Sequence, residues 1–364
     1  MALEIDTRFM AMAVQMAERG LGTTAPNPSV GAVVVCPKTR KVLGRGWTQP
    51  GRRPHAEPIA LKLSGKAAFG ATLYVTLEPC SHFGVSPPCV EAIMAAGVQR
   101  VVVGIKDPDP RVAGRGLTRL REAGIAVSLG VLSSACRWVT LGHILRVTER
   151  RPFIQLKLAL NSAGQVPRGK GGKPAWVTGA DACKRGHLLR AKADAIVIGQ
   201  KTLVDDNPLL TCRLPGLAHQ SPARFILSGK TPISGTFRIF SDNSTTTSWI
   251  TRHTSLVPST ILRSKCAIIR VTDVDNQIWL PAVVENFVAN GITRLLVEGG
   301  PTIWRAFDRF RLVDEVIMFL ARSKTDQHQD AIEMLKSFVS RTPFKLIRKT
   351  ALEHDDIFIF RKAT

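Results

Sequence analysis

Three potential metal ligands place the strongest constraint on how this chain can fold. They are His55, Cys80 and Cys89, and Glu57 stands two residues after the histidine. Three protein ligands leave a fourth tetrahedral position on zinc for water, which is typical of a catalytic rather than a structural zinc site. Zinc lowers the pKa of such a water to about 7, so Glu57 could accept its proton and pass it to a leaving amine. The fold must therefore bring these four side chains together.

The local sequence indicates which elements carry the three ligands. Residues 72–77 (TLYVTL) have the composition of a buried strand, so Cys80 is expected just beyond its carboxyl end. Cys89 follows two prolines and begins an apolar periodic run. This predicts the first turn of a helix, where the helix dipole favours a thiolate. A second helical run follows His55.

The combination of His-x-Glu with two Pro-Cys pairs matches the known signature of zinc-dependent deaminases. Nucleic-acid deaminases carry two residues between their cysteines, whereas eight separate Cys80 from Cys89. The longer segment predicts a loop beside the metal, where His82 either contacts a substrate or is simply solvated. The gap argues against a nucleic-acid deaminase, which is kept as an alternative.

Length and element pattern predict two domains. At 364 residues the chain is too long for one ordinary domain. We place the boundary at residue 147, giving domains 1–147 and 148–364, with the charged stretch 146–152 as linker. Helices alternate with strands in both parts, which predicts a layered α/β architecture. The expected strands are 30–36, 42–48, 72–77, 100–105, 153–160, 195–198 and 294–297, and the expected helices are 5–19, 117–123, 180–191 and about 301–310.

Composition narrows the compartment and the partners. No apolar stretch approaches the roughly 18 residues of a membrane span, and the N-terminus lacks a signal-peptide core, so we expect a cytoplasmic protein. Seven scattered cysteines show no disulfide framework. The net charge of +22 is compatible with nucleic-acid binding, with steering of a phosphorylated substrate and cofactor, or with a compositional bias without function.

Three glycine- or serine-rich segments of the second half predict turns or loops, but none of them identifies a function by itself. The expected strand 294–297 runs into Glu298-Gly-Gly-Pro301 and a helix, a geometry that binds phosphate but also forms a tight turn without a ligand. Residues 169–172 (GKGG) predict a flexible basic loop, and Ser241–Ser248 predicts a surface loop.

Longer motifs make the match more specific. The chain resembles the RibD family, in which a pyrimidine deaminase is fused to a reductase of riboflavin biosynthesis. In the first half the resemblance is carried by residues 26–31 (PNPSVG), 55–57 (HAE), 76–82 (TLEPCSH), 87–89 (PPC) and 107–116 (DPDPRVAGRG). It implies a cytidine-deaminase-like three-layer α/β/α domain. It also implies zinc ligation by His55, Cys80 and Cys89, proton transfer by Glu57, and substrate contacts by Asn27 and His82.

The second half is similar to the family's reductase, which has a dihydrofolate-reductase-like α/β fold. The matching segments are 155–158 (QLKL), 176–179 (WVTG), 206–211 (DNPLLT), 298–302 (EGGPT) and 312–315 (LVDE). The resemblance implies a phosphorylated pyrimidine substrate and a homo-oligomer such as a dimer. The implied NADPH contacts are Ala159, Trp176, Thr202, Asp206, Gly300, Pro301 and Thr302. The implied substrate contacts are Arg190, Leu210, Arg213 and Glu298.

The second half also departs from the family pattern. Asn161 and Ala163 replace the usual Ser and Asp after the first reductase strand, and Ser228 stands where Asp is common. In the deaminase loop, Val85 replaces a usual Arg. An alternative is therefore a deaminase joined to a degenerate reductase domain. The favoured hypothesis is a bifunctional enzyme that deaminates 2,5-diamino-6-ribosylamino-4(3H)-pyrimidinone 5′-phosphate and then reduces its ribosyl group with NADPH.

Overall fold

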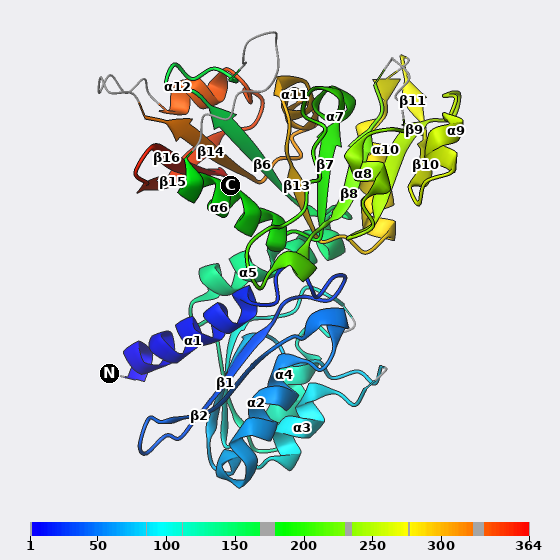
Figure 1. Cartoon of the computed structure of the whole chain (residues 1–364). Helices are drawn as coiled ribbons and strands as arrows, with labels where there is room; N and C mark the ends of the chain where they lie inside the picture. The colour runs from blue at the N-terminus through cyan, green and yellow to red at the C-terminus, as the bar shows by residue number, and fades with distance from the viewer. Residues whose placement is uncertain are drawn as a thin grey trace. The chain divides into compact units, whose positions relative to one another are not determined.

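The chain divides into two units, Met1–Arg151 and Pro152–Thr364, whereas the sequence predicts a boundary at residue 147. The computed structural model describes residues 2–84, 86–110, 112–167, 179–229, 235–275, 277–322 and 331–363 (Figure 1). Helix α5 (Ser133–Thr148) reaches into the expected linker 146–152, so the beginning of that stretch is helical.

The first unit is built on a five-stranded sheet in the order β2-β1-β3-β4-β5 among its described residues. β1 pairs antiparallel with β2 and β3, and β3, β4 and β5 are parallel to one another. The strands are β1 Gly31–Val35, β2 Val42–Trp47, β3 Thr72–Leu77, β4 Arg100–Ile105 and β5 Ala126–Leu129. The helices are α1 Ala2–Glu18, α2 Ala56–Ser64, α3 Cys89–Ala95, α4 Arg115–Glu122 and α5.

Helices cover both faces of this sheet, which confirms the predicted three-layer α/β/α domain. On one face, α1 and α5 pack on alternate strand residues such as Val33 and Tyr74. On the other face, α2, α3 and α4 pack on Ala32, Leu73 and Val75. This alternation follows from the period of two along a strand whose two faces are both buried.

The second unit is built on a nine-stranded sheet in the order β10-β9-β8-β7-β13-β6-β14-β16-β15, again among the described residues. The strands from β10 to β14 in this order run parallel, and β16 runs antiparallel to both of its neighbours, β14 and β15. The strands are β6 Phe153–Leu160, β7 Ala195–Gly199, β8 Ala223–Leu227, β9 Thr247–Arg252, β10 Ala267–Val271, β13 Arg294–Val297, β14 Glu315–Ala321, β15 Phe344–Ala351 and β16 Asp355–Lys362, with a separate hairpin β11 Asp273–Val274 and β12 Gln277–Ile278.

Helices again cover both faces. Those packed with the strand residues Leu156, Ala195 and Val197 are α10 Leu280–Ala289, α11 Pro301–Arg309 and α12 Ala331–Lys336. The opposite side is covered by α6 Ala180–Ala191, α7 Gln200–Asp206, α8 Arg238–Ser241 and α9 Ser259–Leu262. Because β7, β13 and β6 are adjacent and parallel, the segments that follow them meet at one edge of the sheet, where ligands of open α/β sheets bind.

The predicted surface loop 241–248 is confirmed over residues 242–246, and it is shorter than predicted because α8 ends at Ser241 and β9 begins at Thr247, whose side chain is buried. The predicted basic loop 169–172 lies outside the described residues. In the described part of the chain, no helix combines the length and apolarity of a membrane span.

Candidate active sites

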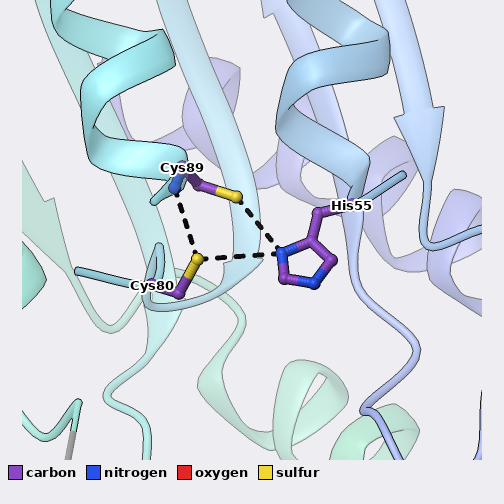
Figure 2. A group of neighbouring side chains, drawn as sticks. All are labelled: His55, Cys80 and Cys89. Atoms are coloured by element: carbon purple, nitrogen blue, oxygen red, sulfur yellow. Dashed lines mark hydrogen bonds between the residues drawn. The ribbon is translucent and has the colours of Figure 1, made fainter. Parts of the chain in front are cut away.

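His55, Cys80 and Cys89 converge in the first unit (Figure 2). His55 is the N-cap residue of α2, Cys89 is the first residue of α3, and Cys80 lies beyond the end of β3. The Nδ1 atom of His55 lies 3.3 Å from Sγ of Cys89 and 3.7 Å from Sγ of Cys80. The backbone N–H of Cys89 donates to Sγ of Cys80 at 3.3 Å. The predicted elements and their convergence are thus confirmed.

This donor set fits a tetrahedral zinc ion. Zinc bonds of about 2.0–2.3 Å to nitrogen and sulfur place neighbouring ligand atoms roughly 3.5–3.8 Å apart, close to the separations found here. The hydrogen bond from Cys89, followed by that from His55, lowers the pKa of Cys80 to about 4. Cys80 is therefore ready as a thiolate, which is the form that binds metal.

Glu57 lies in the first turn of α2 and is only 3% exposed. Burial, and then the charge of Cys80, raises the pKa of Glu57 to about 7. A carboxyl group with such a pKa can both take up and release a proton near neutral pH, which general acid–base catalysis requires. Glu57 is not needed as a zinc ligand, because a catalytic zinc ion has three protein ligands and His55, Cys80 and Cys89 supply all three.

Glu78 supports the metal site in a way that its place in the 76–82 motif does not predict. Its buried carboxylate accepts four backbone N–H groups, from Asp107 (3.2 Å), Gly114 (2.9 Å), Gly116 (3.0 Å) and Leu117 (3.4 Å). These donors lie 29 to 39 residues away along the chain, so no local signal identifies them. The carboxylate joins the turn that carries Cys80 to the first turn of α4.

Replacing Glu78 with glutamine should therefore weaken the connection between the turn that carries Cys80 and the start of α4. Each carboxylate oxygen accepts two of the four N–H groups, so replacing one oxygen by an amide NH2 leaves two of them without a partner, at about 1–3 kcal/mol each. We expect unfolding of the first unit at lower denaturant and a zinc affinity reduced by about 10- to 100-fold. Urea unfolding and metal titration of the full chain would measure both. The matched control is Glu91→Gln: Glu91 pairs with Arg119 at the surface, so its loss should change stability by less than about 1 kcal/mol.

The two predicted substrate residues of this unit differ in their surroundings. Nδ2 of Asn27 lies 3.5 Å from the carbonyl oxygen of Arg52, three residues before His55, so Asn27 borders the segment that carries a ligand. His82 is exposed in the segment between the two cysteines. Arg119 holds the beginning of that segment through a 3.2 Å bond from Nη1 to the carbonyl oxygen of Ser81.

In the second unit, Arg190 and Glu298 form a bidentate ion pair in which both N···O distances are 2.9 Å. Their side chains are 14% and 10% exposed. Nη1 of Arg190 also donates to the carbonyl oxygen of Thr211 at 3.2 Å. Although burial opposes it, the charges of Arg190 and Lys157 lower the pKa of Glu298 to about 2. Arg190 and Glu298, predicted together as substrate contacts, are therefore in direct contact.

Several of the residues predicted to contact the cofactor lie at or just after the carboxyl ends of adjacent strands. Ala159 is near the end of β6, and Thr202 belongs to α7 after β7. The turn after β13 has Gly299 at φ +126°, and a Cβ atom there would lie 2.8 Å from Oγ1 of Thr202, so the close approach requires glycine. Pro301 and Thr302 open α11, whose N-cap residue Gly300 has open space around its Cβ position.

The remaining predicted residues are placed as follows. Asp206 ends α7; desolvation and the carboxylates of Asp205 and Glu298 raise the pKa of Asp206 to about 6. Arg213 is exposed. Leu210 adopts a left-handed φ of +58°, and the whole residue is only 2% exposed. Trp176 lies outside the described residues.

The unusual residue Asn161 has a local role in the turn after β6. Its Oδ1 accepts the N–H groups of Ala163 (3.1 Å) and Gln165 (2.9 Å), and its own N–H donates to the carbonyl oxygen of Gln165 at 2.8 Å. An asparagine closes such a turn as a serine can. The departure at this position therefore leaves the end of β6 ordered.

Comparison with known proteins covers both units. Residues 3–105 match the cytidine and deoxycytidylate deaminase zinc-binding region, and residues 152–322 match the RibD C-terminal domain. The riboflavin biosynthesis protein RibD of Aquifex aeolicus is 36% identical over 321 residues, 88% of each chain. That of Escherichia coli is 36% identical over 327 residues, 87% of each chain. The diaminohydroxyphosphoribosylaminopyrimidine deaminase/5-amino-6-(5-phosphoribosylamino)uracil reductase of Thermotoga maritima has a similar crystal structure, with TM-score 0.83, 31% identity and all of both chains covered.

Proposed function

The chain belongs to the RibD family of riboflavin biosynthesis proteins, and on this premise we propose which of its residues serve each of the two reactions. It has both domains of a bifunctional enzyme, a zinc-binding deaminase domain and an NADPH-using reductase domain. The reactions are a hydrolysis and a reduction, as the sequence resemblance implied. The observation that carries the assignment is the convergence of His55, Cys80 and Cys89 beside the buried carboxyl group of Glu57.

For the first reaction, we propose the substrate 2,5-diamino-6-ribosylamino-4(3H)-pyrimidinone 5′-phosphate. His55, Cys80 and Cys89 would hold zinc, which when bound activates water for attack on the amino-bearing ring carbon. Glu57 takes the proton that the water loses and gives it to the departing ammonia. We assign the orientation of the pyrimidine to Asn27, whose side chain contacts the Arg52 segment, and to exposed His82 in the segment after Cys80.

For the second reaction, the protein orients two ligands and needs no covalent step of its own. NADPH supplies the hydride that converts the ribosyl group to a ribityl group. We assign its binding to Ala159, Trp176, Thr202, Asp206 and the turn Gly300–Thr302, where the positive end of the α11 helix dipole suits a phosphate. Arg190, Leu210, Arg213 and Glu298 would hold the phosphoribosyl substrate.

Compartment and assembly belong to the same proposal. We place the enzyme in the cytoplasm, where its seven free cysteines suit a reducing environment. A homodimer is the proposed oligomer, by analogy with the family. The net charge of +22 would favour encounter with a phosphorylated pyrimidine and a phosphate-bearing cofactor.

A coupled assay with the full-length protein tests the proposal. With the diaminopyrimidinone substrate and NADPH, we expect ammonia release and NADPH oxidation in a ratio of about one. Without NADPH, ammonia alone should appear. After zinc removal by a chelator, both signals should be lost with this substrate, whereas NADPH oxidation should persist with the deaminated intermediate. If the intermediate supports no NADPH oxidation in the zinc-loaded enzyme, the second domain is a degenerate scaffold and the bifunctional assignment is wrong.

A further inference from the structure

His143, on α5, is a largely buried histidine that neither of the proposed reactions uses. Its side chain is 10% exposed, and its Nε2 atom lies 3.2 Å from Oδ1 of Asp107, whose side chain is 9% exposed. A carboxylate oxygen accepts hydrogen bonds, so Nε2 carries the proton and donates it. Nδ1 of the same ring has no hydrogen-bond partner among the described residues, so the bond to Asp107 orients the ring.

Asp107 lies just after β4 and begins a segment that its own side chain helps to hold. Oδ1 of Asp107 also accepts the backbone N–H of Asp109 at 2.8 Å. The carbonyl oxygen of Asp109 in turn accepts the backbone N–H of Val112 at 2.8 Å. Gly114, at a left-handed φ of +88°, is the N-cap residue of α4. The hydrogen bond from His143 therefore acts at the first residue of the chain that leads into α4.

Both ends of this segment donate to Glu78, the buried carboxylate behind the metal site. The backbone N–H groups of Asp107 and Gly114 point to the same oxygen, Oε2, at 3.2 Å and 2.9 Å. Glu78 stands two residues before Cys80, which is assigned to zinc. A displacement of Asp107 would therefore be felt by the turn that carries Cys80. Because α5 and α4 cover opposite faces of the sheet, the bond from His143 also joins one helix layer to the segment that leads into the other.

We propose that His143 is a positioning residue for the metal site of the deaminase. By donating to Asp107, it keeps the segment before α4 in contact with Glu78. Glu78 in turn fixes the turn that carries Cys80. The inference rests on the proposed function, which assigns zinc to Cys80, and it gives His143 no direct contact with metal or substrate.

The zinc affinity of the full-length protein, measured by competition with a chromophoric chelator, tests the proposal. His143→Phe keeps a ring and loses the donor, so we expect the affinity to fall about 10-fold, at the lower end of the range for groups behind a metal ligand. In excess zinc, the kcat of deamination should fall by a similar factor while KM stays within about twofold. His143→Leu, a smaller variant without a donor, should behave alike. His143→Gln keeps an N–H donor and should restore both quantities to within about threefold.

Two comparisons separate positioning from a general loss of stability. Thr140→Val removes a buried hydroxyl three residues earlier in α5, whose hydrogen bond to the carbonyl oxygen of Cys136 (2.9 Å) stays within the helix. This control should lower the urea midpoint but leave zinc affinity and kcat unchanged. In the double variant, His143→Phe should add less than about twofold to the loss of zinc affinity caused by Glu78→Gln, because residues of one network are not additive.

Several results would overturn the proposal. They are an unchanged zinc affinity in His143→Phe, an equal loss of affinity in Thr140→Val, no recovery in His143→Gln, or losses that multiply in the double variant with Glu78→Gln. The affinity measurement needs no turnover, so the two levels can be told apart. If the unaltered protein binds zinc and releases no ammonia, yet His143→Phe weakens zinc binding as expected, the proposed deaminase function fails while the positioning role of His143 stands.

Discussion

Replacing Glu57 with glutamine is expected to leave zinc bound and to lower the rate of deamination by about 10²- to 10⁴-fold. His55, Cys80 and Cys89 are untouched by the change, and Glu57 is not needed as a ligand. Glutamine has nearly the same shape in the first turn of α2, but it cannot take up a proton from water or deliver one to a leaving amine. Ammonia release would measure the rate, and elemental analysis should find about one zinc per chain.

Two further variants serve as controls for this experiment. Glu91→Gln removes an exposed carboxylate from the first turn of the neighbouring helix α3 and should keep full deaminase activity. Cys80→Ala removes a ligand and should lose both zinc and activity. NADPH oxidation with the deaminated intermediate should be unaffected in Glu57→Gln, because that reaction is assigned to the other unit. Deamination that persists in Glu57→Gln at a rate near that of the unaltered enzyme would mean that another group transfers the proton.

The zinc site was predictable because each ligand carries its own local signal. The strand that precedes Cys80 has the predicted bounds 72–77, and the helix that begins at Cys89 starts where two prolines indicate it. His55 likewise stands at a helix start. Helices and strands with strong periodicity and clear end signals can therefore be located from the sequence. Once the two helices and the strand pack in one α/β layer, the ends that carry the three ligands come together.

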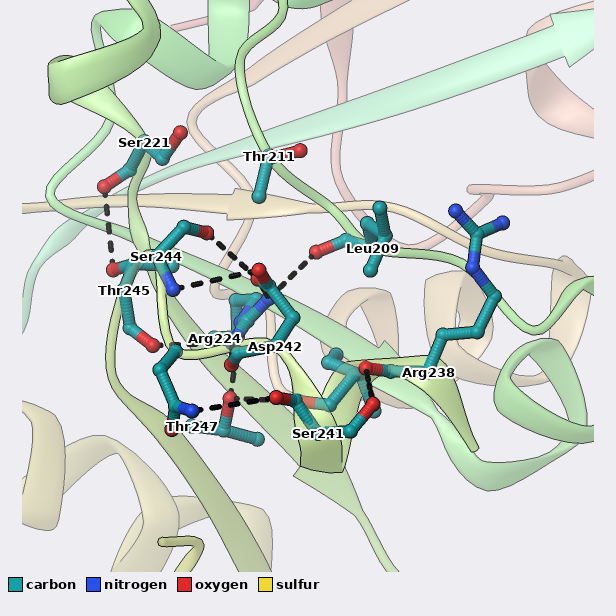
Figure 3. A network of polar contacts seen from close by, with 12 residues as sticks. Leu209, Thr211, Ser221, Arg224, Arg238, Ser241, Asp242, Ser244, Thr245 and Thr247 are labelled. Carbon is teal, nitrogen blue, oxygen red and sulfur yellow. Dashed lines mark hydrogen bonds and ion pairs between the residues drawn. The ribbon is translucent and has the colours of Figure 1, made fainter. Parts of the chain in front are cut away.

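Other features could not be predicted because they depend on distant partners. Helix α5 and strand β5 were missed; the apolar residues of α5 are dispersed around the helix, and β5 has only four residues. The Ser/Thr-rich stretch 241–248 reads as a surface loop, but the buried guanidinium of Arg224 recruits Asp242, Thr245 and Thr247 from it (Figure 3). These residues supply hydrogen-bond acceptors to the Arg224 guanidinium, and no local sequence pattern indicates that this guanidinium is buried.

The ion pair between Arg190 and Glu298 is an extreme case, since its members are 108 residues apart and only the family resemblance brought them together. Removing one member of a buried ion pair leaves an uncompensated charge, at about 3–5 kcal/mol. The two side chains are 14% and 10% exposed, so solvent can screen this charge only slightly. The pair therefore affects both the stability of the second unit and the orientation of Arg190 toward a substrate.

Glu298→Gln is accordingly expected to destabilise the second unit by about 3–5 kcal/mol and to abolish most NADPH oxidation while deamination continues. Because the pKa of Glu298 in the folded protein is about 2, below its ordinary 4.5, the pair stabilises the fold above about pH 4.5. That contribution is lost as the pH falls toward 2. In the glutamine variant this part of the acid sensitivity should disappear. Urea unfolding between pH 2 and 7, followed by circular dichroism, would measure it.

Stability and function can be separated with a double variant. Arg190→Met combined with Glu298→Leu replaces the ion pair with apolar side chains, and such replacements are often neutral or stabilising. We expect the double variant to unfold close to the unaltered protein but to remain without NADPH oxidation, because Arg190 would no longer bind the substrate. Glu333→Gln, which removes an exposed i,i+3 pair with Lys336 in the same unit, should change neither property. Restored NADPH oxidation in the double variant would show that the pair only supports the fold and does not contact the substrate.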